Sequence, residues 1–374
     1  LGGSARWRQR AATLVVGGAR RRLGIDVGVD EDVRDQVRRI AALPVEERRA
    51  ALVDTGYLVP HWPKPYGLGA SARTQLVIDA ELDAAGVRRP DLVIGAWAVP
   101  TILRHGTEEQ RERFAGPTLR GELAWCQLFS EPEAGSDLAA LRTRATKVDG
   151  GWSLSGQKVW TSRARDADWG ICLARTNPDV PKHKGITYFL VDMTTPGITL
   201  RPLREITGES MFNEVFLDGV FVPDGCVVGA VDGGWALARS TLADERVAMG
   251  GSSAVGESVE KLVSALGSVT DPVVLDRLGG LVADGTAVSL VDLRATLRTL
   301  EGQGPGSESG VRKLIGVRHR QAVAEAAVEL LGVGGAVFSP VLHEFLLSRC
   351  LTIAGGTEQI LLSVAGERVL GLPR

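Results

Sequence analysis

The sequence predicts an α+β fold that is mostly α-helical, in which a helical region, a small β region and a second helical region follow one another. Apolar residues recur at helical spacing over about residues 31–119, short alternating runs bounded by turn residues occupy about residues 122–228, and helical spacing returns from Gly233. Helices and strands are therefore segregated along the chain, which argues against a doubly wound α/β enzyme.

The first region is predicted to consist of helices interrupted by one extended loop. Val33, Val37 and Ile40 are three or four residues apart, which places them on one face of a helix. Residues 76–85 and 108–114 show the same spacing. Three prolines at residues 60–65 cannot belong to a helix interior, so this segment is expected to be a loop.

The middle region is predicted to be a compact β domain, either a sandwich or a barrel. Its strands are short and follow one another at roughly 8–12-residue spacing, which is typical of these two architectures. The expected strands are residues 151–156, 169–175, 186–191, 198–203, 213–217 and 220–222.

The third region is expected to be helical again. Its predicted helices cover residues 235–249, 259–266, 274–300, 309–331 and 340–351, with a Gly-rich linker at residues 301–306. The predicted domains are a helical domain at 46–121, a β domain at 122–228 and a helical bundle at 229–374.

Composition excludes several classes of function. Lys and Arg number 43 against 45 Asp and Glu, and this balance does not favour a nucleic-acid binder. No apolar run is long enough to span a membrane. The five histidines lack metal-ligand spacing, so no metal site is expected, and the four distant cysteines suggest a reducing, cytoplasmic setting. No glycine fingerprint for a nicotinamide cofactor or ATP is present.

Four motifs carry the functional signal. They read WCQLFSEPEAGSD (125–137), GQKVWTS (156–162), FNEVFLDGVFVP (212–223) and IAGGTEQI (353–360). The first could present backbone N–H groups and hydroxyls to an anionic or heteroaromatic ligand, although alone it would equally suit an ordinary strand-to-turn junction.

Taken in this order, the four motifs resemble the acyl-CoA dehydrogenase family from about Asp54 to Arg374. The resemblance implies an N-terminal helical domain, a middle β domain and a C-terminal four-helix bundle that hold FAD non-covalently. It implies α,β-dehydrogenation of an acyl-CoA thioester, with electrons passed to an electron-transfer flavoprotein. Residues 1–45 match nothing in the family's opening and are expected to be an extension or a linker.

The catalytic base is expected at an uncommon position. Most of the family places it in a Tyr-Glu-Gly-Thr motif before the last helix, and Gly355 stands there in this chain. A minority supplies a Glu directly before an Arg in the first long C-terminal helix, which matches Glu245 and Arg246. The resemblance therefore implies Glu245 as base. The alternative is a solvated carboxylate paired with Arg246 or Arg239. Gly355 would leave space for the base and could donate its N–H to the thioester oxygen.

Other site residues are carried over from the resemblance. Phe129 and Ser130 would lie against the isoalloxazine ring, which Trp160 would cover; core packing is the alternative for Trp160. A turn-stabilising hydroxyl is the alternative for Ser136. The remaining expected contacts are Ser162, Thr357 and Gln359 to the flavin, and Ser136 and Arg246 to the substrate.

One departure bears on assembly. The family's homotetramers carry an Arg-x-x-Phe-Gly motif after the base-bearing helix, and residues 264–272 lack it. The resemblance then narrows to the actinobacterial steroid side-chain subclass, in which two unlike subunits or two fused halves share each flavin in a heterotetramer-like assembly. An acyl-CoA oxidase and a non-catalytic scaffold subunit remain the alternatives.

Overall fold

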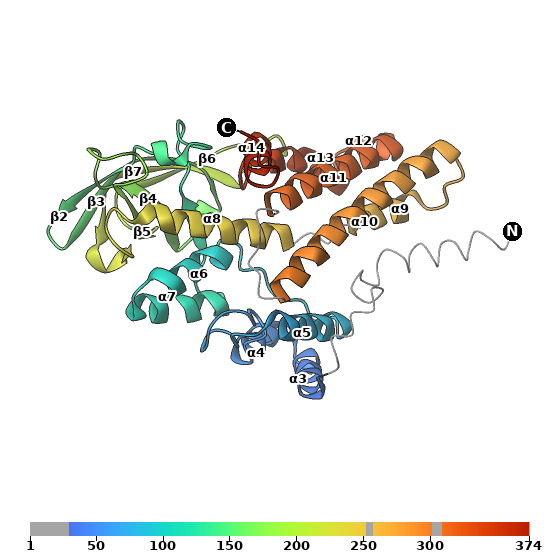
Figure 1. Cartoon of the computed structure of the whole chain (residues 1–374), viewed down its shortest axis with the longest axis horizontal. Helices are drawn as coiled ribbons and strands as arrows, with labels where there is room; N and C mark the ends of the chain where they lie inside the picture. The colour runs from blue at the N-terminus through green and yellow to red at the C-terminus, as the bar shows by residue number, and fades with distance from the viewer. Residues whose placement is uncertain (1–29, 252–256, 301–308, 374) are drawn as a thin grey trace. The chain divides into compact units, whose positions relative to one another are not determined.

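The computed structural model describes residues 30–251, 257–300 and 309–373 (Figure 1). Helices come first, a sheet follows, and helices return, so the predicted fold class is confirmed. The chain forms two compact units that divide at residues 248 and 249, within a helix of the third region. The predicted linker at residues 301–306 lies outside the described residues.

Within the described residues, the N-terminal domain contains five helices: α3 (Glu31–Ala42), α4 (Val45–Asp54), α5 (Ala72–Ala84), α6 (Gly95–His105) and α7 (Glu108–Arg120). Val33, Val37 and Ile40 of α3 are buried, as their spacing predicted, and α3 packs on α5. Helix α3 lies within residues 1–45, which the sequence left unassigned. Its apolar face nevertheless belongs to the helical domain.

The strands of the middle domain form one connected sheet in the order β6, β7, β3, β2, β4, β5 and β8, with β1 paired to β4. Their bounds are β1 (Trp125–Leu128), β2 (Arg144–Val148), β3 (Gly151–Ser162), β4 (Trp169–Arg175), β5 (Ile186–Asp192), β6 (Ile198–Pro202), β7 (Phe212–Pro223) and β8 (Val227–Val228). Strands β1, β2 and β8 were not among those expected from the sequence.

Strand β7 is continuous where the sequence predicted two strands. Asp218 and Gly219 together face Ser155 of β3, and Gly219 has a φ of 64°. The Gly219 N–H donates to Ser155 Oγ at 3.1 Å. The turn-like pair is therefore a β-bulge, which glycine favours because it adopts positive φ without a side-chain clash.

Helix α7 packs against strands β1 and β4 through aromatic side chains. The Phe114 ring lies edge-on to Trp169, with centroids 4.8 Å apart, and to Trp125 at 5.4 Å. The Trp125 indole donates to Thr118 Oγ1 of α7 at 2.8 Å. The odd-numbered side chains of β1 thus face the helical domain, as the two-residue period of a strand requires.

Helix α8 (Gly234–Gly251) opens the third region, and the remaining helices are α9 (Glu257–Leu266), α10 (Pro272–Leu300), α11 (Ser309–Leu330), α12 (Val333–Ala336), α13 (Pro340–Ser348) and α14 (Glu358–Arg368). Helix α11 is central, because it packs against α9, α10, α13 and α14. No helix in the described part of the chain is long and apolar enough to cross a membrane.

Candidate functional site

The predicted base, Glu245, projects from α8 and is only 9% exposed. Gln127 of β1 donates its Nε2–H to Glu245 Oε2 at 3.2 Å. The side chain is therefore buried and hydrogen-bonded, unlike the solvated carboxylate that the sequence left as the alternative. The side chain of Arg246 lies outside the described residues.

A third side chain orients the glutamine. The Trp97 indole Nε1–H of α6 donates to Gln127 Oε1 at 2.5 Å, and Trp97 is 8% exposed. Trp97, Gln127 and Glu245 come from three different elements: α6, β1 and α8. They form a chain of hydrogen bonds that reaches the carboxylate.

Helix α8 is anchored one turn before the base. Thr241 is fully buried, and its hydroxyl lies 2.8 Å from Thr101 Oγ1 of α6 and 3.3 Å from the Tyr188 phenol of β5. Burial raises the pKa of Tyr188, so the phenol stays protonated and can donate. An ion pair between Arg104 and Asp244 joins the same two helices. The backbone that carries Glu245 is thus tied to both α6 and the sheet (Figure 1).

Trp160 occupies a bulge in β3. Val159 and Trp160 together face Glu214 of β7, and Trp160 has a φ of 58°. A bulky residue rarely adopts positive φ, and such a conformation costs about 1–3 kcal/mol. The indole is 62% exposed and lies edge-on to Phe212. Simple core packing, the alternative for this residue, does not describe an exposed ring.

A buried ion pair holds residues 129–131 against strand β3. Lys158 is fully buried, and its Nζ donates to Glu131 Oε1 at 2.7 Å, Phe129 O at 3.2 Å and Leu173 O at 2.8 Å. Burial favours protonation of Glu131, but the Lys158 ammonium and hydrogen bonds from residues 142 and 143 outweigh it and lower the pKa of this carboxyl.

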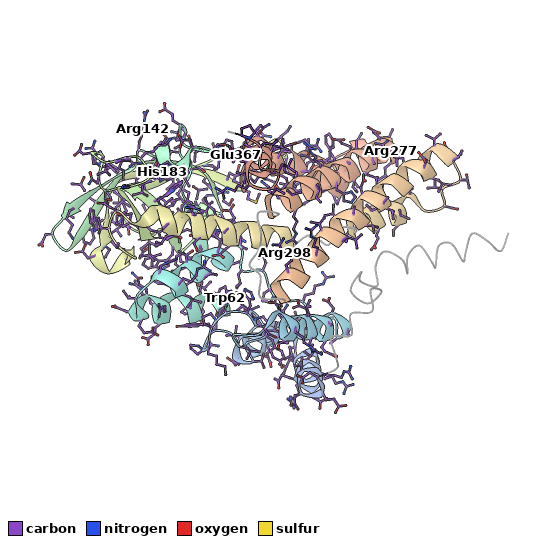
Figure 2. All side chains as sticks on the ribbon, viewed as in Figure 1. Trp62, Arg142, His183, Arg277, Arg298 and Glu367 are labelled. Carbon is purple, nitrogen blue, oxygen red and sulfur yellow. The ribbon has the colours of Figure 1, made fainter. Side chains whose placement is uncertain are left out.

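Residues 129–131 also contact the bulge of β3 directly. The Val159 N–H donates to Ser130 O at 2.9 Å, so Ser130 lies beside the start of the bulge. Arg142, labelled in Figure 2, forms an exposed ion pair with Glu133 at 2.8 Å, just after these residues in the chain. The first two motifs of the sequence are therefore joined by main-chain and side-chain hydrogen bonds.

The other residues expected in the β domain differ in their surroundings. The Phe129 ring is buried and lies edge-on to Tyr188, with centroids 5.9 Å apart, so the ring is part of the hydrophobic core. Ser130 and Ser162 are half-buried and Ser136 is exposed. The structure brings Ser130, Trp160 and Ser162 into the unit that carries Glu245.

The C-terminal unit carries the remaining expected residues. Lys313 of α11 donates to Ala354 O, and also to Gly356 O at 2.6 Å, so it holds both carbonyls that flank Gly355. Gly355 and Gly356 have φ values of 66° and 102°. Thr357 is the N-cap of α14 and accepts from Ile360 N–H, while Gln359 is exposed.

The residues around Trp160 suit a heteroaromatic cofactor. Thr161 Oγ1 and Asn213 Oδ1 are buried and have no hydrogen-bond partner among the described residues. Exposed indole surface supports stacking, and unpaired polar atoms can bond a polar ring edge. This donor and acceptor set fits a flavin.

Sequence reasoning missed the residues that position the site, namely Trp97, Gln127, Lys158, Thr241 and Lys313. Gln127 and Lys158 lie within the motifs at 125–137 and 156–162, and the alternation of β1 could have placed Gln127 on the same face as Trp125. The partners of the four residues other than Gln127 come from distant segments, so no local signal identified them.

Three family models match the chain. The acyl-CoA dehydrogenase N-terminal domain matches residues 29–122, the middle domain 126–220 and the C-terminal domain 232–370. The chain therefore belongs to the acyl-CoA dehydrogenase family, whose members are FAD-dependent oxidoreductases. The resemblance that the four motifs indicated is confirmed.

Two members of the family are similar to this chain over most or all of its length. The chain is 62% identical to the acyl-CoA dehydrogenase FadE34 of Mycobacterium tuberculosis over 379 residues, which cover 100% of this chain and 53% of that protein. The chain thus spans about half the length of FadE34. It is 35% identical to the acyl-CoA dehydrogenase IpdE1 of Mycolicibacterium smegmatis, with 88% and 89% of the two chains covered.

Solved structures show the same fold. The Tcur3481–Tcur3483 steroid ACAD superposes with a TM-score of 0.78 at 27% identity, over 94% of this chain and 100% of that one. The ChsE4–ChsE5 complex from Mycobacterium tuberculosis gives a TM-score of 0.76 at 28% identity, over 92% and 97%.

Proposed function

We propose that this chain catalyses FAD-dependent α,β-dehydrogenation of an acyl-CoA thioester, with Glu245 as the base that removes the α-proton. One observation carries the proposal: Glu245 is buried and hydrogen-bonded, in the same unit as the exposed Trp160 indole, while glycine occupies the family's more common base position.

The chemistry places two demands on the protein. The α-proton of a thioester is weakly acidic, so the base benefits from a desolvated pocket, and the developing enolate oxygen needs aimed hydrogen bonds. Glu245 meets the first demand through its burial. We assign the second to the Gly355 N–H, in a loop that Lys313 holds by its flanking carbonyls.

Bound FAD would supply the acceptor for the β-hydride. On the protein side, we propose that Trp160 covers the ring, that the Ser130 hydroxyl lies near its pyrimidine edge, and that Ser162 bonds near N5 or the pyrophosphate side. A contact from Phe129 would come from its main chain, because its ring is buried. Thr357 and Gln359 are proposed flavin contacts from the C-terminal unit, and Ser136 and Arg246 are proposed contacts on the substrate side.

The substrate and partners are proposed from the relatives. One structural relative is described as a steroid ACAD, which supports a CoA-linked steroid side chain as substrate. FadE34 is about twice as long as this chain, and ChsE4–ChsE5 is a complex of two proteins. We therefore propose that a second dehydrogenase-like subunit or fused half completes the flavin site, and that an electron-transfer flavoprotein takes the electrons.

The replacement Glu245→Gln tests the proposed base. We expect the flavin to be retained while dye reduction with butyryl-, octanoyl- or cholanoyl-CoA falls about 10²–10⁴-fold, because a neutral amide cannot accept the proton. The measurement is flavin absorbance together with anaerobic dye reduction, on the chain purified with its partner.

Glu81→Gln is the matched control, since Glu81 is a paired carboxylate of α5 in the same unit. Unchanged dye reduction in Glu245→Gln would eliminate this residue as the base. Peroxide release under air in place of dye reduction would identify an oxidase instead.

A further inference from the structure

We propose that Gln127 is a positioning residue for the reaction: held by Trp97, it keeps the Glu245 carboxylate ionised and in one orientation. This inference rests on the proposed function, because it concerns the residue assigned there as the base. It starts from the hydrogen bonds Trp97 Nε1–H to Gln127 Oε1 and Gln127 Nε2–H to Glu245 Oε2.

The indole determines which way the glutamine amide points. An indole N–H can only donate, so the group 2.5 Å from it must be the amide oxygen. The amide NH₂ group then faces Glu245 at 3.2 Å. A flipped amide would set two donors against each other at Trp97 and two acceptors against each other at Glu245. Trp97 therefore makes Gln127 a donor toward the carboxylate.

The three side chains cannot easily move apart. Gln127 shares its face of β1 with Trp125, whose indole is bonded to Thr118 of α7. Helices α6 and α8 are joined by the Thr101–Thr241 hydroxyl pair and by the Arg104–Asp244 ion pair. We call the hydrogen-bonded side chains Trp97, Gln127 and Glu245 the relay. Because these contacts lie beside the relay, the Gln127 amide meets Glu245 in a prearranged geometry.

A donor aimed at a carboxylate favours its ionised form. The charged groups beside it on α6 and α8, Arg104 and Asp244, pair with each other and are the same in every variant compared below. Without the Gln127 donor the carboxylate should therefore bind a proton more tightly than in the parent, and a smaller fraction is available as base at mildly acidic pH. A hydrogen bond to a charged group is strong enough to move this titration by about one pH unit. Gln127 should therefore extend the active range of the enzyme to lower pH.

The test compares Gln127→Met with Gln157→Met. Gln157 also donates to a glutamate, Glu214, at 2.9 Å, but it lies outside the relay. For each flavin-loaded chain with its partner, kcat/KM for the best of the three thioesters is measured against pH. The infrared band of the protonated Glu245 carboxyl, assigned by its loss in Glu245→Gln, is titrated separately.

For Gln127→Met we expect the acid limb of kcat/KM and the infrared titration to move upward together by about one pH unit. Gln157→Met should move neither. Trp97→Phe removes the orienting donor together with part of a buried ring. It should shift both in the same direction by a smaller amount, which supplies a second variant should Gln127→Met fold poorly.

Two outcomes would overturn the inference. An infrared titration that is identical in Gln127→Met and the parent would show that the amide does not act on the carboxylate. A loss of kcat/KM at every pH with an unmoved acid limb would make Gln127 a purely structural residue. If instead Glu245→Gln is fully active but the infrared shift is present, the relay stands and the proposed base is wrong.

Discussion

At the scale of single residues, the site is built from buried polar groups that partner one another. Lys158 and Glu131 are a buried ion pair, and the lysine also bonds two carbonyl oxygens. Such pairs bring little net stability, but removing one partner leaves an uncompensated buried charge. In this chain the pair matters for the geometry of the site, because it joins the segment that carries Ser130 to strand β3, which carries Trp160.

Lys158→Met should therefore destabilise the chain strongly. We expect the free energy of unfolding in urea to fall by about 3–5 kcal/mol, because Glu131 stays buried without its cation. The double variant Lys158→Met with Glu131→Gln should recover part of this loss, since the uncompensated charge is gone. A loss for Lys158→Met under about 1 kcal/mol would show that the pair is not desolvated in solution.

At the scale of elements, the packing of α10 against α11 leaves an unusual histidine. His319 of α11 is 7% exposed, and neither ring nitrogen has a hydrogen-bond partner among the described residues. The ring fits because residue 285 of α10 is a glycine, where an added Cβ would lie 3.0 Å from His319 Nε2. Burial lowers the pKa of His319, and Asp284 offsets this only partly.

The stability of the chain should consequently depend on pH through His319. The unfolded imidazole binds a proton near its ordinary pKa of about 6.5, whereas the folded one resists protonation. Stability is thus lost as pH falls below about 6.5, by at most about 1.4 kcal/mol per pH unit for this residue. Urea unfolding between pH 8 and 5 should show a smaller loss for His319→Leu and for His319→Gln. Parallel curves for all three proteins would contradict this account.

At the scale of the whole molecule, the residues expected at the site belong to two compact units. Glu245, Ser130, Trp160 and Ser162 lie in the first, and residues 355–359 lie in the second. Large apolar side chains of the second unit are strongly exposed, among them Val333 and Phe338 at 82% each. Burying such side chains is favourable, so a partner that covered them would gain stability from the contact.

Flavin retention should therefore depend on the proposed partner. We expect the chain expressed alone to bind much less than one flavin, and co-expression with a second dehydrogenase-like subunit to bring it close to the stoichiometric amount. The ratio of flavin absorbance to protein after gel filtration measures this. Full flavin occupancy in a monomeric preparation of the chain alone would argue against a shared flavin site.

The sequence predicted much of the fold because the relevant signals are local. The spacing of Val33, Val37 and Ile40 gave α3, and the alternating runs gave five of the eight strands, with β7 split in two at the Gly219 bulge. The site was predicted only through the family motifs. Gln127 received no role, because nothing near it in the chain indicates a carboxylate partner.

By itself, then, the sequence determined the order of helical and β regions, the family, and the substitution of glycine at residue 355, since periodicity and residue identity are properties of neighbouring positions. Tertiary structure alone decided that Gln127 meets Glu245 across 118 residues of chain and that Trp97 orients the amide between them. The physical reason is that hydrogen bonds between α6, β1 and α8 arise only when packing brings those three elements together.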